Sequence, residues 1–352
     1  MNIGILTFHW GTNYGGVLQA FALQKYLEKL GHGVFIINYA PYTFRDNFIF
    51  CFKSKRPTVI FANLKQYFKE RHFVRFRKKH LKTSQRFYNL EELVNNPPQM
   101  DVYIAGSDQI WNPYIIDNYG KPYFLGFGNK QIKRIAYAAS FGCDKYPKNK
   151  EKQLKELLRN FDAISHREKT GEQILSKIKI TNSILLPDPT LLLKMSDYYS
   201  LIKKLNYKKV DYFFYILQDN QTVIQSILSK TRKENKFVVA NTSIKYFFSG
   251  IEQWLNYIIS SKFIITNSFH GIVFSIIFKK QFVAIPIEGK LEGMNDRINT
   301  LLYDFDLESR IIEDITQVET ILKTEINWEK VGNKTKELQD KAFKFLTKHI
   351  TA

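Results

Sequence analysis

Residues 263–275 read Phe-Ile-Ile-Thr-Asn-Ser-Phe-His-Gly-Ile-Val-Phe-Ser, and this stretch is the most informative part of the chain. The apolar start indicates a short buried strand, Asn267 and Ser268 are of the type that caps a helix, and the apolar run from Ile272 predicts that helix. His270 therefore lies where a strand gives way to a helix. Backbone N–H groups at a helix start attract anions, and an imidazole there can move a proton on a bound phosphate or carboxylate. The alternative is that His270 only helps to form the turn.

A similar pattern opens the chain. Residues 3–8 predict a strand, residues 17–30 carry apolar side chains at helical spacing, and residues 34–38 predict the next strand. The connecting loop, residues 11–16, reads Gly-Thr-Asn-Tyr-Gly-Gly. Such a loop suits a phosphate or a sugar hydroxyl that comes close to the backbone. It has neither the Lys-Ser/Thr ending of a P-loop nor the spacing of a dinucleotide fingerprint.

Polar residues also follow the strand predicted at residues 101–105, in the sequence Gly-Ser-Asp-Gln-Ile-Trp-Asn. The carboxyl ends of parallel strands are where open α/β sheets bind ligands. Asp108 and Gln109 can bind hydroxyl groups at this position. Trp111 can either stack on a sugar ring or lie in the core.

Further strands are predicted at residues 135–139, 161–165, 212–217 and 237–240, each followed by helical or loop sequence. This alternation predicts an α/β fold of two doubly wound, Rossmann-like domains with parallel sheets that face a cleft. We expect an N-terminal domain at 1–160 and a C-terminal domain at 161–327. A terminal helix at 328–352 is expected to pack back on the N-terminal domain.

The length of 352 residues fits two domains, because single cores usually stop growing at roughly 250–300 residues. Two cysteines, Cys51 and Cys143, supply neither a disulfide framework nor a thiolate metal site. The N-terminus lacks the charge and the long apolar run of a signal peptide, and no segment has the roughly 20 apolar residues of a membrane span. These features predict a cytoplasmic protein.

The formal net charge is +19, and residues 53–86 are dense in lysine and arginine with a single acidic residue, Glu70. Apolar residues recur in this region at near-helical intervals, namely Phe61, Leu64, Phe68, Phe73, Phe76 and Leu81. A basic and aromatic amphipathic helix can lie on an anionic membrane surface, here the inner face of the cell membrane. The alternatives are a solvated helix and, in last place, a nucleic-acid surface, since no zinc finger, helix-turn-helix or RNA-binding signature is present.

Seven motifs follow one another from residue 3 to about residue 310: GTNYGGVLQAFALQKYL, GSDQIWN, YAASFG, ISHRE, LPDPTLLL, TNSFHG and GMNDRI. In their order and spacing the chain resembles the polysaccharide pyruvyl transferase family. The resemblance implies a GT-B-like pair of domains, the first for the acceptor and the second for the donor. It also implies a transferase that moves pyruvate from phosphoenolpyruvate to a sugar, lipid-linked or not, forming a pyruvate ketal on an envelope, capsular or exopolysaccharide precursor. Phosphoenolpyruvate is a co-substrate, and this route requires neither a cofactor nor a metal.

This chemistry assigns roles to particular residues. A general acid/base must move protons on the enol carbon and the sugar hydroxyl, and cations must meet the donor's phosphate and carboxylate. The catalytic candidates are His270, Arg167 and Lys290. The donor-binding candidates are Asn267, Ser268, Gly271, Asn295 and Arg297. The acceptor-binding candidates are Asn13, Tyr14, Gly15, Gly16, Ser107, Asp108, Gln109 and Trp111.

Each cationic candidate also has a structural interpretation. Arg167 can pair with Glu168 or another surface acid, and Lys290 lies in a glycine-flanked stretch that is either a mobile active-site loop or a solvated turn. Asp296 and Arg297 can form an ion pair at a helix start.

The chain departs from the family pattern at one position. Better-known pyruvyl transferases have an arginine two positions before the motif histidine, where this chain has Ser268. Either the other cations suffice, or the donor differs and the protein is a GT-B-type nucleotide-sugar glycosyltransferase. A third hypothesis is a non-catalytic, membrane-associated partner in polysaccharide assembly.

Overall fold

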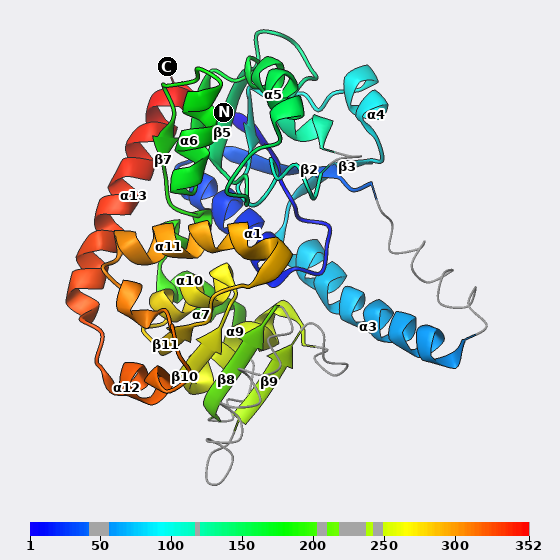
Figure 1. Ribbon diagram of the computed structural model, residues 1–352. Coiled ribbons are helices and arrows are strands. Elements are labelled where there is room, and N and C mark those ends of the chain that lie inside the picture. The colour runs from blue at the N-terminus through cyan, green and yellow to red at the C-terminus, as the bar shows by residue number, and fades with distance from the viewer. Residues whose placement is uncertain (42–55, 117–119, 203–209, 218–236, 242–248, 352) are drawn as a thin grey trace. The chain divides into compact units, whose positions relative to one another are not determined.

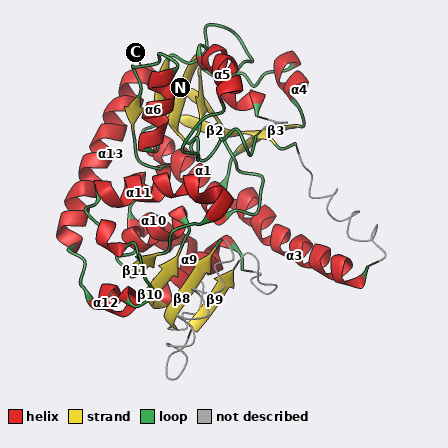
Figure 2. Cartoon of the chain, viewed as in Figure 1, coloured by secondary structure: helices red, strands yellow, loops and turns green. Residues whose placement is uncertain are grey.

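The computed structural model describes residues 1–41, 56–116, 120–202, 210–217, 237–241 and 249–351, with the backbone alone for 237–241 (Figure 1). The chain forms two compact units. The first comprises Met1–Leu193 and Glu337–Ala352, and the second comprises Lys194–Lys336. Each unit is built on a parallel sheet with helices connecting its strands (Figure 2).

Within the described residues of the first unit, seven parallel strands form one sheet in the order β3-β2-β1-β4-β5-β6-β7. The strands are β1 (Asn2–Leu6), β2 (Gly33–Tyr39), β3 (Thr83–Phe87), β4 (Val102–Ala105), β5 (Lys133–Ala139), β6 (Ala163–His166) and β7 (Ile184–Leu185). The chain adds strands on one side of β1 and then on the other, so the order reverses between β1 and β4. Ligands bind at such a switch point in open α/β sheets.

The helices of the first unit connect these strands. They are α1 (Tyr14–Lys29), α3 (Pro57–His80), α4 (Leu90–Asn95), α5 (Glu151–Leu158), α6 (Lys169–Lys177) and the C-terminal part of α13 (Trp328–Thr351). Short 3-10 turns lie at η1 (Lys121–Phe124), η2 (Lys148–Lys150) and η3 (Pro189–Leu192). The side chain of Asn13 caps α1 by accepting a hydrogen bond from the Gly16 N–H at 3.2 Å.

The boundary between the units differs from the one expected at residue 160. The strand–helix pattern does restart near residue 161, but β6 pairs in parallel with β5, Ile135 opposite Ala163, and so continues the first sheet. The unit boundary falls at Leu193, after β7 and η3. A repeated strand–helix pattern marks the next strand of a sheet as readily as a new domain. The arrangement of the sheets about a cleft stays a prediction.

In the described part of the second unit, four parallel strands lie in the order β11-β10-β8-β9. They are β8 (Val210–Ile216), β9 (Phe237–Asn241), β10 (Ser261–Thr266) and β11 (Gln281–Ala284). The helices are α7 (Met195–Ile202), α9 (Ile251–Ser260), α10 (Phe269–Ile277), α11 (Asn295–Asp304), α12 (Gln317–Lys323) and the start of α13, with turns η4 (Gly289–Met294) and η5 (Glu308–Arg310). The chain runs from β8 to β9 and then to β10 on the other side of β8. The switch point of this sheet therefore lies between β8 and β10.

The basic helix predicted within residues 53–86 is present as α3, and Cys51, Lys53 and Lys55 lie outside the described residues. Its apolar side chains do not form one stripe. Phe73 and Phe76 are buried in the core, whereas Phe61 and Phe68 are 58% and 54% exposed. The two pairs differ because, at 3.6 residues per turn, they occupy different faces of the helix.

None of the helices that the structure describes is both long enough and apolar enough to cross a membrane.

Candidate active site

The TNSFHG motif lies at the switch point of the second sheet, where β10 turns into α10. The Thr266 hydroxyl donates to the Tyr215 carbonyl of β8 at 2.5 Å and accepts from the Ser268 N–H at 3.0 Å. Ser268 then caps α10, because its hydroxyl accepts from the Gly271 N–H at 3.2 Å. One threonine thus ties the neighbouring strand to the start of the helix.

Gly271 is required by the closeness of this turn. A Cβ atom at position 271 would lie 2.6 Å from the Thr266 hydroxyl oxygen, which is closer than real contacts allow. Asn267 is also fixed, since its side-chain oxygen accepts from the Leu217 N–H, after β8, at 2.7 Å. Gly271 and Asn267 therefore shape the turn, whatever else they bind.

His270 occupies the first turn of α10 and is buried. Its ring meets the Phe269 ring edge-on, with the centroids 5.1 Å apart. The Arg297 guanidinium, from α11, lies 5.7 Å from the centroid of the same phenyl ring. Phe269 thus contacts both the imidazole and a buried cation at a helix N-terminus, where the helix dipole also favours an anion.

The other donor-side candidates lie in the segment before Arg297. The Asn295 amide accepts from the Ile287 N–H at 2.8 Å and donates to the Ile287 carbonyl at 2.7 Å, closing the loop that contains η4. Asn295 thus positions the start of α11. Lys290 lies in η4, and its side chain is outside the described part of the structure.

Arg167 belongs to the first unit and is buried in a carboxylate network. Its guanidinium pairs with Asp188, lies 3.6 Å from an Asp108 oxygen and is 3.4 Å from the Ser107 hydroxyl. Burial lowers the pKa of Arg167, but the carboxylates of Asp188, Asp108 and Glu168 outweigh it and raise the pKa above its ordinary value. This environment favours the structural interpretation, with Asp188 and Asp108 as the ion-pair partners.

The remaining polar motif residues of the first unit also hydrogen-bond to one another. The Ser107 N–H donates to the Gln19 side chain at 3.1 Å, and the Ser107 hydroxyl donates to the Ala138 carbonyl at 2.7 Å. Glu168 accepts from the N–H groups of Phe141 and Gly142 at 2.7 and 3.1 Å. These bonds connect the carboxyl ends of neighbouring strands, so the motifs form one buried polar layer.

Two acceptor-side residues lie in the core instead. Trp111 is fully buried, stacked on Phe124 and in contact with Phe141, so it offers no ring face to a sugar. Tyr14 is buried against Phe73, with the ring centroids 5.0 Å apart. For Trp111 this corrects the expectation of sugar stacking in favour of the core alternative, because aromatic neighbours from other segments enclose the ring.

The structure brings three other acceptor candidates, Asn13, Gly16 and Asp108, to one small pocket at the switch point of the first sheet. This loop pocket has a volume of about 170 Å³ and is lined by Phe8, Trp10, Gly11, Asn13, Gly16, Val17, Asp108 and Ile115. Gln109, by contrast, accepts from the Asn112 amide at 2.8 Å within the buried layer. Gly15 is buried in the first turn of α1.

Trp10 was not among the residues expected from sequence. It is partly exposed at the loop pocket, and its indole N–H donates to the Tyr123 hydroxyl at 3.3 Å. Its position in the sequence could have indicated a site residue, because Trp10 lies four residues past the end of β1 and directly before the glycine-rich loop. Aromatic rings beside polar groups at strand ends are common in sugar-binding pockets.

A sequence profile described as polysaccharide pyruvyl transferase matches residues 13–289. The chain belongs to the polysaccharide pyruvyl transferase family. This is a family of transferases of polysaccharide biosynthesis, as the motif resemblance predicted. A search of the curated proteins finds no match.

Solved structures resemble the whole chain at low sequence identity. The UDP-GlcNAc 2-epimerase from Methanocaldococcus jannaschii, in complex with UDP-GlcNAc and UDP, is 13% identical with a TM-score of 0.53, covering 99% of each chain. The UDP-GlcNAc 2-epimerase from Neisseria meningitidis, bound to UDP-GlcNAc, is 9% identical with a TM-score of 0.50, covering 98% of this chain and 100% of that one. The expected GT-B-like α/β fold of this family member is thereby confirmed.

Proposed function

We propose that this member of the family transfers pyruvate from phosphoenolpyruvate to a sugar of a polysaccharide precursor, forming a cyclic ketal. The proposal is carried by one observation: the His270 ring and the Arg297 guanidinium each lie against the Phe269 ring, at the switch point of the second sheet. A proton carrier and a buried cation at a helix N-terminus are the groups that an enol phosphate requires.

The residues of the second unit supply the donor side. Arg297 and the N-terminus of α10 hold the anionic groups of phosphoenolpyruvate, and Lys290 is the further cation proposed for this role. Ser268, which replaces the arginine of better-known members, serves as the N-cap of α10. The cation at this turn then comes from Arg297 on the neighbouring helix.

In the proposed pyruvyl transfer, His270 donates one proton and later accepts one, so it is unchanged at the end of the reaction. Protonated His270 gives its proton to C3 of the enol, so C2 becomes electrophilic and the methyl group forms. A sugar hydroxyl adds to C2 and loses its proton to the neutral imidazole. The C2–O bond to phosphate then breaks, and a second sugar hydroxyl forms the second C–O bond and closes the ring. Its proton leaves with the phosphate.

The first unit supplies the acceptor side in this proposal. In the loop pocket, the Asp108 carboxylate and the Asn13 side chain can bind sugar hydroxyls, while Trp10 and Phe8 meet the apolar face of the ring. Arg167 acts through its ion pairs by holding Asp108 in place. It therefore positions an acceptor residue and does not contact the donor.

A nucleotide-sugar glycosyltransferase is the second candidate, and Ser268 favours it. With serine at this position the start of α10 offers hydrogen-bonding groups in place of one cation, and a diphosphate can bind there through the helix N-terminus. The choice of donor separates the two candidates.

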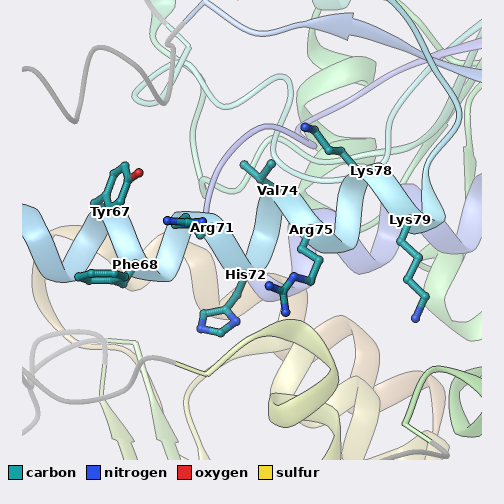
Figure 3. Close-up of a pocket in the computed structure, with 8 residues that line it drawn as sticks. All are labelled: Tyr67, Phe68, Arg71, His72, Val74, Arg75, Lys78 and Lys79. Atoms are coloured by element: carbon teal, nitrogen blue, oxygen red, sulfur yellow. The ribbon is translucent and has the colours of Figure 1, made fainter.

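We also propose that α3 contacts an anionic membrane surface. Figure 3 shows Phe68, His72, Arg75 and Lys79 projecting from one side of the helix, and Phe61 lies one heptad before Phe68. Exposed aromatic rings and cations on one face suit a lipid interface with anionic headgroups. The acceptor of such an enzyme would be lipid-linked.

The decisive experiment is incubation of the purified protein with phosphoenolpyruvate and a panel of aryl and lipid-diphosphate sugars, following phosphate release and product mass. The mass gain of a pyruvate ketal, abolished in His270→Ala with folding unchanged, is the expected result. Turnover with nucleotide sugars alone would establish the glycosyltransferase. Full polymer modification by His270→Ala in cells would favour the non-catalytic assembly partner.

A further inference from the structure

The segment that forms one wall of the loop pocket has no regular secondary structure of its own. This wall segment, residues 9–13, lies between β1 and α1 and contributes Trp10, Gly11 and Asn13 to the pocket. Backbone carbonyl groups in such a segment need hydrogen-bond partners from elsewhere in the protein. Glycine leaves the backbone at position 11 without a side chain to hold it, so the shape of the wall depends on those partners.

Arg77, in the last turn of α3, supplies two of these hydrogen bonds. Its Nη1 group donates to the Gly11 carbonyl at 2.9 Å and to the His9 carbonyl at 3.4 Å. These two carbonyl groups lie at the two ends of the Trp10–Gly11 pair. A single guanidinium group thus holds the backbone on both sides of the residues that line the pocket.

Glu70 holds the Arg77 guanidinium in turn. Nη2 of Arg77 donates to the Glu70 carboxylate at 2.5 Å, and the two side chains are 14% and 9% exposed. The residues are seven positions apart, close to two helical turns, so both side chains project from the same side of α3. A charge-assisted bond in this largely buried setting fixes the direction of the guanidinium. Because Glu70 offsets the charge of Arg77, the pair is suited to hold the wall segment and not to attract an anion.

The same side of α3 makes two further contacts with this part of the first unit. The Gln66 amide donates to the Thr12 hydroxyl at 3.1 Å, and the buried Phe73 ring packs against Tyr14 with the centroids 5.0 Å apart. Gln66, Phe73 and Arg77 follow one another at spacings of seven and four residues, which places them along one stripe of the helix. One face of α3 therefore supports the wall segment along its length.

Two contacts from other elements hold the rest of the wall segment. Asn13 is fixed as the N-cap of α1 through the Gly16 N–H at 3.2 Å, and the Trp10 indole N–H donates to the Tyr123 hydroxyl at 3.3 Å. The first contact fixes the end of the segment, and the second fixes the indole ring. Arg77 holds the backbone between them, so we expect its removal to loosen the wall of the loop pocket.

We propose that Arg77 is a positioning residue for the acceptor. Held by Glu70, its guanidinium keeps the wall segment in the conformation in which Trp10 and Gly11 form a site for a sugar ring. Arg77 acts through Trp10 and is assigned no contact with either substrate. The clamp rests on the contacts of α3 alone, whereas the use of the loop pocket by the acceptor rests on the proposed function.

The clamp is tested first without any substrate, by acrylamide quenching of tryptophan fluorescence. Each protein is measured with and without Trp10→Phe, so that the difference reports on Trp10 alone. Arg77→Gln is expected to raise the quenching constant of Trp10 by about twofold or more, because local loosening exposes the ring. Arg77→Lys should give a smaller rise, since lysine keeps the charge but has one nitrogen where arginine uses two. Unchanged quenching of Trp10 in folded Arg77→Gln would overturn the clamp.

Steady-state kinetics then test the positioning of the acceptor. Arg77→Gln should raise KM for the acceptor about tenfold and leave KM for the donor unchanged, with part of the loss recovered in Arg77→Lys. A residue needed only for stability would lower the amount of folded enzyme, and so the apparent kcat, without changing the acceptor KM. Gln66→Ala, at an exposed position with little risk to folding, should change the quenching and the acceptor KM in the same direction by about twofold. A wild-type acceptor KM in both Arg77→Gln and Gln66→Ala would overturn the proposal.

The matched control is Arg310→Gln in the second unit. Arg310 also holds two backbone carbonyl groups, those of Ile321 and Thr324, at 2.7 and 2.5 Å. The control should lose stability and keep the wild-type values of Trp10 quenching and acceptor KM. Equal changes in Arg310→Gln and Arg77→Gln would show a general loosening of the protein and would refute the specific role of Arg77.

The acceptor KM is measured with an aryl sugar and whichever donor the protein uses. Turnover with nucleotide sugars in place of phosphoenolpyruvate would contradict the proposed function and leave the test of Arg77 intact. Turnover with phosphoenolpyruvate, together with a wild-type acceptor KM in Arg77→Gln, would support the proposed function and refute the positioning role.

Discussion

The Arg297 guanidinium lies 5.7 Å from the centroid of the Phe269 ring, directly before His270 in the chain. This relationship joins two helices, α10 and α11, at the carboxyl end of the second sheet. It places a buried cation beside a helix N-terminus whose own N-cap, Ser268, carries no charge. The charge that an anionic donor requires can thus come from a neighbouring element.

Replacement of Arg297 tests this assignment. Arg297→Gln is expected to raise KM for phosphoenolpyruvate by about 10- to 100-fold, since a charge-assisted hydrogen bond contributes about 1.5–3 kcal/mol. Arg297→Lys should recover part of the loss, because it keeps the charge without the fork of donors. Steady-state kinetics at saturating acceptor measures both. An unchanged KM in folded Arg297→Gln would move the anion site elsewhere.

Asp108 gives a test on the acceptor side. Asp108→Asn keeps the side-chain shape but removes the charge that accepts from a sugar hydroxyl, so KM for the acceptor should rise about tenfold while KM for phosphoenolpyruvate stays unchanged. Asp188→Asn is the matched control, because Asp188 also pairs with Arg167 but does not line the loop pocket. The control should lose stability and keep its acceptor KM. A rise of equal size in both variants would show that Asp108 acts only through Arg167.

The alternation of strands and helices could be predicted from the sequence, because apolar runs bounded by capping residues and glycines determine local structure directly. Asn13 and Ser268 both cap helices as their residue types predict. The family motifs could be recognised because their residues and their order along the chain are present in the sequence itself. What they bind was harder to predict, since these polar side chains are buried and hydrogen-bond within the protein: Ser107 with Gln19, Gln109 with Asn112, and Glu168 with the N–H groups of Phe141 and Gly142.

Two aromatic residues show why the site was only partly predictable. Trp111 lies in a polar turn, and only the packing of Phe124 and Phe141, from later in the chain, buries its ring. Trp10 has a less distinctive sequence context but remains accessible at the loop pocket. Whether an aromatic ring faces solvent or core depends on contacts between distant segments, which a single sequence does not display.

Gly271 tests the close turn at the start of α10. In Gly271→Ala the new methyl group meets the hydroxyl of Thr266, which is held by Tyr215 and Ser268, so the unfolding free energy should fall by about 1–3 kcal/mol. Gly332→Ala in α13 is the control in the same unit, because nothing lies within 4 Å of its new methyl group. It should gain about 0.5–1 kcal/mol from helix propensity. Urea unfolding measures both, and opposite signs are expected.

Buried His166 predicts a loss of stability in mild acid. Burial lowers the pKa of His166 from 6.5 to about 4, so between these pH values the unfolded chain binds a proton that the folded chain does not. Stability should therefore fall as the pH drops from 6.5 to about 4, by up to about 3 kcal/mol for this group, and the contribution levels off below that. His166→Gln should flatten this part of the curve of unfolding free energy against pH. An unchanged slope would assign the acid sensitivity to other groups.

The exposed face of α3 gives the last prediction. If it contacts anionic lipid, the protein should sediment with vesicles of phosphatidylglycerol and phosphatidylcholine but not with phosphatidylcholine alone, and added salt should weaken the binding. The double variant Arg75→Glu/Lys79→Glu should lower the partition at least tenfold, because each basic residue near the surface contributes about 1 kcal/mol. Phe68→Ser should lower it further by removing an exposed ring.

The matched control reverses two exposed lysines of α13, Lys344→Glu/Lys348→Glu, and changes the net charge by the same amount. A specific surface on α3 requires that this control bind vesicles more strongly than Arg75→Glu/Lys79→Glu does. Equal losses in the two double variants would mean that the overall charge of +19 attracts the lipid and that α3 has no special part in it. Phe68→Ser separates these cases again, since it leaves the net charge unchanged and acts only where the ring enters the interface.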